Sequence, residues 1–129
     1  MHIMKATDVG FKGFGEVYYS SINPGVVKGW HFHHNVTLNY VVLKGMIKFV
    51  LYDEREGSPT RGLVQEIFMG GQNYVRVTVP PRIWSGFKCI GKEPAFVCNV
   101  IDKPHDPAEA KRREIHDPGF PYDWGKRDR

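Results

Sequence analysis

Apolar residues occur in short runs along the whole chain, and turn residues separate one run from the next. The segment 75–79 alternates apolar and polar side chains, which is typical of a strand with one buried face. In the segment 46–52, Ile47, Phe49 and Leu51 share one face while Lys48 lies on the other. These patterns predict strands at 16–22, 38–43, 46–52, 63–68, 74–79, 85–90 and 95–101. A further short apolar strand leads into a histidine cluster.

One further segment, 107–115, has a helical pattern. Asp106 is a candidate N-cap, Pro107 suits the first helical position, and Glu109 follows the cap by three residues. A helix this short and polar cannot carry a core, so the many strands predict an all-β sandwich or barrel. The 129 residues fit a single domain, 1–129, and its aromatic tail at 117–124 is expected to pack back onto it.

Composition and charge narrow the function classes. The chain has 18 lysines and arginines against 14 aspartates and glutamates, a formal charge of +4, without a dense basic stripe along one element. This pattern disfavours nucleic acid and favours a small anionic ligand such as a phosphate ester. No apolar run has membrane-spanning length and no signal peptide is evident, so we expect no membrane contact and a cytoplasmic location. Cys89 and Cys98 are expected to be reduced core thiols.

Three histidines fall within four residues, at His31, His33 and His34. Imidazole exchanges protons near neutral pH and is also the commonest metal ligand. Proton transfer, metal binding and packing are therefore three alternative roles for these histidines. His31 and His33 share a face on a strand, as in the His-x-His pairs of metal-binding cupins. The positions where such sites have further ligands hold Leu38 and Ser85, and two ligands rarely hold a divalent ion. We therefore predict no metal.

A set of short motifs resembles the dTDP-4-dehydrorhamnose 3,5-epimerases, in that family's order. The motifs are Gly25-Val26-Val27-Lys28-Gly29-Trp30-His31, a glycine hairpin at Gly45, the loop Asp53-Glu54-Arg55-Glu56-Gly57-Ser58-Pro59-Thr60-Arg61-Gly62, Gln72-Asn73, Pro80-Pro81 with Gly86-Phe87, and Ile115-His116-Asp117-Pro118 with Trp124. The resemblance covers about residues 11–124. It implies a jelly-roll cupin barrel, usually a homodimer that exchanges N-terminal strands.

The resemblance also implies a reaction. Family members remove a proton next to the C4 keto group of a dTDP-linked sugar, and because the ketone itself acidifies its neighbours, no cofactor is required. By position, His31 is the base and Asp117 is the carboxylate that orients it. A carboxylate against one imidazole nitrogen suits a base, since it favours the protonated ring.

Substrate-binding residues carry over by position as well. Lys28 and Lys12 stand where the family has phosphate-binding arginines, and they keep the charge but lose the bidentate fork. Phe14 and Glu16 belong to a segment that resembles the family's nucleotide cover. His33 and Trp30, beside the base, are expected to line the pocket, although Trp30 could equally be a core residue and Lys28 a solvated charge.

The sequence departs from the family at other catalytic positions. The region of the family's lysine reads Thr37-Leu38-Asn39-Tyr40, its tyrosine falls near Cys98-Asn99, and its second histidine is Ser85. We expect Tyr40, or Tyr122 from the tail, to replace the acid. The predicted function is a nucleotide-sugar epimerase or isomerase. A metal-binding cupin enzyme using His31 and His33, and a non-catalytic sugar-nucleotide binding protein, remain alternatives.

Overall fold

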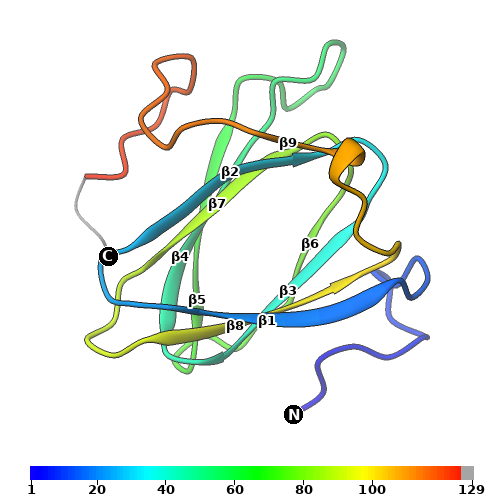
Figure 1. Cartoon of the computed structure of the whole chain (residues 1–129), viewed down its shortest axis with the longest axis vertical. Coiled ribbons are helices and arrows are strands. Elements are labelled where there is room, and N and C mark those ends of the chain that lie inside the picture. Colours follow the sequence, from blue (N-terminus) through cyan, green and yellow to red (C-terminus); the bar gives the residue numbers. More distant parts are fainter. Residues whose placement is uncertain (126–129) are drawn as a thin grey trace.

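The computed structural model describes residues 1–125, and nearly all of its regular structure is β (Figure 1). Two antiparallel sheets face each other. The four-stranded sheet has the order β1-β8-β3-β6, made of Glu16–Ile22, Ala95–Ile101, Leu38–Lys44 and Val77–Val79. The five-stranded sheet has the order β5-β4-β7-β2-β9, made of Val64–Gly70, Met46–Tyr52, Trp84–Cys89, Val27–His33 and Ala110–Arg112.

The all-β prediction is confirmed, and the strands expected at 16–22, 46–52 and 95–101 have those bounds. The strand expected at 74–79 is shorter, since β6 begins at Val77. The closed barrel is not observed. Within residues 1–125, the strands of one sheet do not pair with those of the other, so the two sheets form an open sandwich.

The helix predicted at 107–115 is wrong. Asp106 does cap a turn, because its side chain accepts a hydrogen bond from the Ala108 N–H at 3.0 Å, but the 3-10 helix η1 covers only Pro107–Glu109. The chain then continues as β9, whose residues pair with the edge of β2. A strand edge offers backbone hydrogen-bond partners that an isolated short helix lacks, so tertiary pairing overrides the local helix signals.

The main core lies between the two sheets. Inward side chains such as Val42, Phe49, Met69 and Val79 are almost completely buried there. These residues follow the period-2 alternation of their strands, as expected for a sandwich. The predicted hairpin turn is present at Gly45, where φ is +85° and an added Cβ would meet the Ala95 backbone at 2.9 Å. The core therefore fills most of the space between the sheets.

A second apolar cluster covers the outer face of the five-stranded sheet. It contains Trp30, Val50, Tyr52, Trp84, Phe120 and Trp124. The tail residues Phe120 and Trp124 are 5% and 2% exposed, which confirms that the aromatic tail packs onto the body. Lys48 is fully buried on this face, with its ammonium 5.4 Å from the centre of the Tyr122 ring. This face is thus closed to solvent by aromatic rings.

The loop 53–62 is organised around one carboxylate. Asp53 accepts hydrogen bonds from the backbone N–H and the guanidinium of Arg55 and from the Ser58 and Thr60 hydroxyls. The Arg55 hydrogen bonds are the main cause that holds the Asp53 pKa far below its usual range. Arg55 is therefore an anchor for this loop, as its place in the motif indicates.

Cys89 and Cys98 are both buried and free, as predicted. Among the described residues, no helix has the length and apolar character needed to cross a membrane.

Candidate active site

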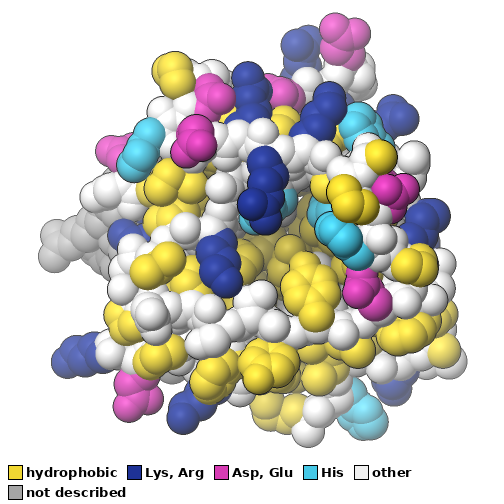
Figure 2. All heavy atoms as spheres, in the orientation of Figure 1, with side chains coloured by type: hydrophobic (Ala, Val, Ile, Leu, Met, Phe, Trp, Pro, Cys, Tyr) yellow, Lys and Arg dark blue, Asp and Glu magenta, His cyan; other side chains and the backbone are white. Residues whose placement is uncertain are grey.

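A cleft of about 490 Å³ lies between the two sheets and receives side chains from both. Strands β2, β7 and β9 form one wall, and β1, β3 and β8 form the other. Figure 2 shows a hollow on this face of the molecule, with Lys, Arg and His side chains gathered around one side of it and hydrophobic side chains along the other. Its lining includes three of the predicted site residues on β2, namely Lys28, His31 and His33, together with Tyr40 on β3.

His31 enters the cleft because β2 is irregular next to it. The pairing of β2 with β7 shifts register between Lys28 and His31, after which His31 lies opposite Ser85 on one side and Arg112 on the other. Burial is the main cause that lowers the His31 pKa to about 4, and the positive charges of Arg112, His33 and Lys28 add to it. At neutral pH the ring is therefore uncharged and has a free lone pair that can accept a proton.

In this region the histidine with a carboxylate partner is His33, and the carboxylate is that of Glu109. The His33 Nδ1 lies 2.6 Å from Glu109 Oε1, and Glu109 Oε2 accepts the Asn35 backbone N–H at 2.6 Å. Burial raises the pKa of Glu109, but these hydrogen bonds outweigh it and the net pKa is lowered. Glu109 is thus a carboxylate that fixes the His33 ring. His33 is thereby a wall of the cleft with a fixed orientation.

Asp117 lies elsewhere, and this corrects the pair expected from the resemblance. Its Oδ2 is 3.1 Å from Arg113 Nε, and its Oδ1 accepts the Gly119 N–H at 2.7 Å. The Arg113 guanidinium lies over the rings of Trp84 and Phe120, which belong to the outer cluster. Within residues 1–125, no hydrogen bond joins Asp117 to His31. The reason is geometric, since the aromatic tail holds this segment against the outer face while His31 points inward.

Trp30 is also corrected, since it is a packing residue and does not line the cleft. Its side chain is 0% exposed and stacks on Phe120 with ring centres 4.6 Å apart, with Trp124 at 5.2 Å. Trp30 and His31 are adjacent in a strand, so their side chains point to opposite faces of the sheet. The structure therefore supports the interpretation of Trp30 as a core residue.

Tyr40 lies in the cleft wall opposite His31, on the four-stranded sheet, next to two further polar side chains. Register places Tyr18 of β1, Asn99 of β8 and Tyr40 of β3 side by side across three strands. Asn99 Nδ2 donates to the Tyr18 hydroxyl at 3.1 Å, and Tyr40 lies near enough to Tyr18 for the two side chains to interact. Burial is the main cause that raises the Tyr40 pKa well above its usual value, and the neighbouring Tyr18 adds to it. Tyr40 therefore keeps its proton.

Two residues that line the cleft, Arg112 and Tyr18, are not among those predicted from the sequence. The sequence contains a signal for one of them, Arg112. Arg112 lines the cleft, in a basic run at 111–113 that falls within the segment expected to be helical. Read as a strand, the same run alternates and sends its middle residue inward. Tyr18 lies in a strand that was correctly expected, but its hydrogen bond to Asn99 depends on long-range pairing. Lys28 Nζ donates to the Ser21 carbonyl at 3.4 Å, at the mouth of the cleft.

The remaining predicted contacts lie outside this cleft. Lys12, Phe14 and Glu16 lie at and before the start of β1, and Phe14 is 66% exposed. They do not appear among the cleft-lining residues of the described chain, and they stay predictions.

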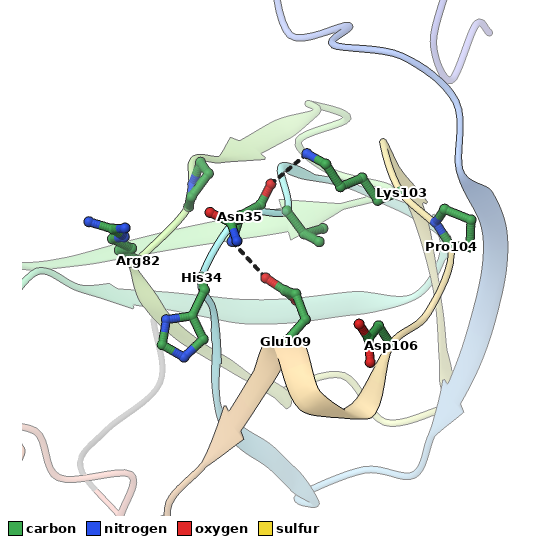
Figure 3. Close-up of a pocket in the computed structure, with 9 residues that line it drawn as sticks. His34, Asn35, Arg82, Lys103, Pro104, Asp106 and Glu109 are labelled. Atoms are coloured by element: carbon green, nitrogen blue, oxygen red, sulfur yellow. Dashed lines mark hydrogen bonds between the residues drawn. The ribbon is translucent and has the colours of Figure 1, made fainter.

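A second, more open hollow of about 820 Å³ adjoins the cleft (Figure 3). Its lining includes His34, Arg82, Lys103 and Glu109, and Lys103 Nζ donates to the Asn35 carbonyl at 2.8 Å. Glu109 borders this hollow while its partner His33 borders the cleft, so their hydrogen bond lies between the two. Among residues 1–125, no three His, Cys, Asp or Glu side chains are grouped to hold a metal ion.

Comparison with known proteins identifies the family. The sequence model of the family described as dTDP-4-dehydrorhamnose 3,5-epimerase matches residues 3–129. Agl13 of Haloferax volcanii, a probable low-salt glycan biosynthesis epimerase, is 37% identical over 107 residues, which are 82% of this chain and 65% of that protein. This chain therefore spans slightly less than two thirds of that relative's length.

Two solved structures are similar over nearly the whole chain. A dTDP sugar isomerase from Desulfovibrio desulfuricans G20 superposes with a TM-score of 0.95 and 38% identity, covering 98% of this chain and 82% of that one. NovW, a 4-keto-6-deoxy sugar epimerase from the novobiocin gene cluster of Streptomyces spheroides, gives a TM-score of 0.80 and 26% identity, covering 88% of this chain and 58% of that one. The chain therefore belongs to the dTDP-4-dehydrorhamnose 3,5-epimerase family.

Proposed function

We propose that the protein is a nucleotide-sugar epimerase or isomerase that removes a proton next to the keto group of a nucleoside-diphosphate 4-keto-deoxysugar. One observation carries this proposal. The imidazole of His31 and the two tyrosines Tyr18 and Tyr40 line opposite walls of a single cleft between the sheets. The names of the similar proteins, a dTDP sugar isomerase and a 4-keto-6-deoxy sugar epimerase, support the substrate class.

The chemistry follows from these groups. His31 accepts the proton from the carbon next to the ketone, and the electron pair moves onto the ketone oxygen as an enolate. Lys28 and Arg112, in the same cleft, favour this negative charge. The tyrosine wall that contains Tyr40 returns a proton to the opposite face of the carbon, which inverts it. The ketone supplies the acidity, so no cofactor is part of the proposal.

The diphosphate has its own partners. Lys28 and Arg112 line the cleft together with His105, and the neighbouring Glu109 carboxylate is hydrogen-bonded to His33. Lysine and arginine side chains in a confined space attract a diphosphate and raise its local concentration. The proposal is therefore that Lys28 and Arg112 bind the phosphates.

We also propose a homodimer. Val17 and Tyr19 are 52% and 67% exposed, and their side chains alternate with the inward-facing Tyr18 on β1. Apolar side chains exposed together on one sheet face favour association. The resemblance implies exchange of N-terminal strands; exchange of the segment before β1 would bring Lys12 and Phe14 to a partner's cleft, while Glu16 stays with β1, which pairs with β8 of the same chain. A reducing compartment such as the cytoplasm suits the two free thiols.

The experiment is solvent exchange into a bound keto sugar. The protein is incubated in deuterium oxide with a dTDP-linked 4-keto-6-deoxyhexose, and deuterium at C3 and C5 is followed by NMR. We expect deuterium at one or both carbons, together with an epimer. A non-catalytic binding protein would leave both hydrogens in place. Exchange that is lost with a chelator and restored by a divalent metal would favour the metal-binding cupin instead.

A further inference from the structure

Three polar side chains cross the inner face of the four-stranded sheet as one connected row. Asn99 of β8 lies between Tyr18 of β1 and Tyr40 of β3 in the strand register. The Asn99 amide is held in one orientation, because its Oδ1 accepts the Asn39 backbone N–H at 3.1 Å and its Nδ2 therefore points to Tyr18. The row is fixed by the sheet itself.

The two tyrosines differ in access to the cleft. Tyr40 is 7% exposed and Tyr18 is 46% exposed, although both line the cavity that holds His31. Asn99 donates to the Tyr18 oxygen at 3.1 Å, and Tyr40 lies across Asn99 from Tyr18 in the strand register. A Tyr18 oxygen that accepts the Asn99 hydrogen bond has its own O–H free for a molecule in the cleft.

We propose that Tyr18 is the catalytic residue that returns the proton, and that Tyr40 and Asn99 are positioning residues that hold its hydroxyl. The inference rests on the function proposed above and deepens it, since it transfers the role of acid from the buried Tyr40 to its more accessible neighbour.

The proton balance is complete without a further reactant. His31 breaks the C–H bond and becomes an imidazolium, leaving an enolate. Tyr18 breaks its O–H bond, a new C–H bond forms on the opposite face, and the enolate electron pair returns to the carbon as the ketone re-forms. The phenolate left on Tyr18 accepts the hydrogen bond from Asn99, which stabilises it. Exchange with water then removes the proton from His31 and restores it to Tyr18.

The test separates exchange from inversion. Tyr18→Phe, Tyr40→Phe and the control Tyr19→Phe are compared in deuterium oxide with the same dTDP-linked keto sugar. Tyr19 is adjacent in sequence but lies on the outer face against Phe96, so it controls for loss of a hydroxyl from β1. We expect Tyr18→Phe to retain deuterium exchange by His31 while epimer formation falls about 100-fold, the lower range for a general acid. Tyr40→Phe is expected to lose about tenfold, and Tyr19→Phe to match the wild type.

Several results would overturn the assignment. A larger loss of inversion in Tyr40→Phe than in Tyr18→Phe would make Tyr40 the donor. Unchanged inversion in Tyr18→Phe would remove Tyr18 from the reaction. Parallel loss of exchange and inversion, with thermal unfolding unchanged, would mean that Tyr18 binds substrate instead. Failure of the proposed function looks different, because the wild-type protein itself would then show no exchange.

Discussion

Trp30 and His31 are neighbours in β2, yet they belong to two regions with opposite properties. Trp30 lies on the outer face of the five-stranded sheet, completely buried under Phe120 and Trp124. His31 lies on the inner face, in a cleft lined by cations and tyrosines. The outer region is closely packed, whereas the inner face around His31 opens into a polar cleft.

The five-stranded sheet thus carries a packed face on one side and a cleft on the other. A cleft between the sheets takes apolar area away from the main core. The aromatic tail compensates by burying a second cluster on the other side of the same sheet. Lys48, on the tail side, is surrounded by rings, while Lys28 and Arg112, on the cleft side, face a cavity. The faces should therefore respond differently to mutation.

The largest effect on rate is expected for His31→Ala. Loss of the base should reduce deuterium exchange by about 10²- to 10⁴-fold, while binding of dTDP changes little because the cations remain. Exchange is measured by NMR and binding by calorimetry. Persistent exchange in this variant would show that another group removes the proton.

The largest effect on stability is expected on the other face. Trp30→Ala should lower the free energy of unfolding by about 3–5 kcal/mol, because it leaves a cavity beneath Phe120 and Trp124. Trp30→Phe should lose clearly less, since the Trp30 indole N–H has no hydrogen-bond partner among the described residues. Urea unfolding measures both. Equal losses in the two variants would indicate that packing is not the cause.

Removal of a cleft cation should weaken phosphate binding selectively. Lys28→Ala is expected to raise the Kd for dTDP about tenfold, roughly 1.4 kcal/mol, and to change binding of the free sugar less. Lys44→Ala, which removes the same charge from the exposed end of β3, is the matched control. Equal weakening for dTDP and for the sugar would count against a phosphate contact.

The pH dependence should report the buried position of His31. Its pKa is lowered to about 4, so the base stays unprotonated as the pH falls through 6.5. We expect kcat/KM, followed by epimer formation, to decline only as the pH approaches 4. At pH 5.5 this is about a tenfold advantage over a histidine of ordinary pKa, provided that His31 alone limits the rate. A decline centred near pH 6.5 would show that the ring is solvated.

The smallest effect is expected for Asp117→Asn. Asp117 pairs with Arg113 on the outer face, so exchange should change by less than about twofold and stability by less than about 1 kcal/mol. If Asp117 instead orients His31 as the resemblance implies, exchange would fall about 100-fold or more. This variant therefore decides between the two arrangements.

The strand pattern was readable from the sequence because each strand of a sandwich buries one face locally. The alternation at 46–52 and the hairpin at Gly45 both appear as expected. The helix at 107–115 was misread, since its cap residues are real but the following residues complete the edge of β2. Arg112 was not predicted as a cleft residue for the same reason, because its side chain points into the cleft only when this segment is a strand.

Four of the residues expected at the site, His31, His33, Lys28 and Tyr40, line one cleft, and their roles there stay predictions. Trp30 and Asp117 were assigned to the same site, and the structure places both on the outer side. Sequence order does not tell which face of a sheet a distant tail will cover.

Local alternation and ordered motifs were sufficient to predict strands β1 to β8, including the strand that carries His31, and the family. The tertiary structure was needed to pair Glu109 with His33, Asp117 with Arg113, and Asn99 with Tyr18. Each of these contacts links residues through the pairing of strands or the docking of the tail. Their partners are chosen by the packing of the whole sandwich, which no single segment encodes.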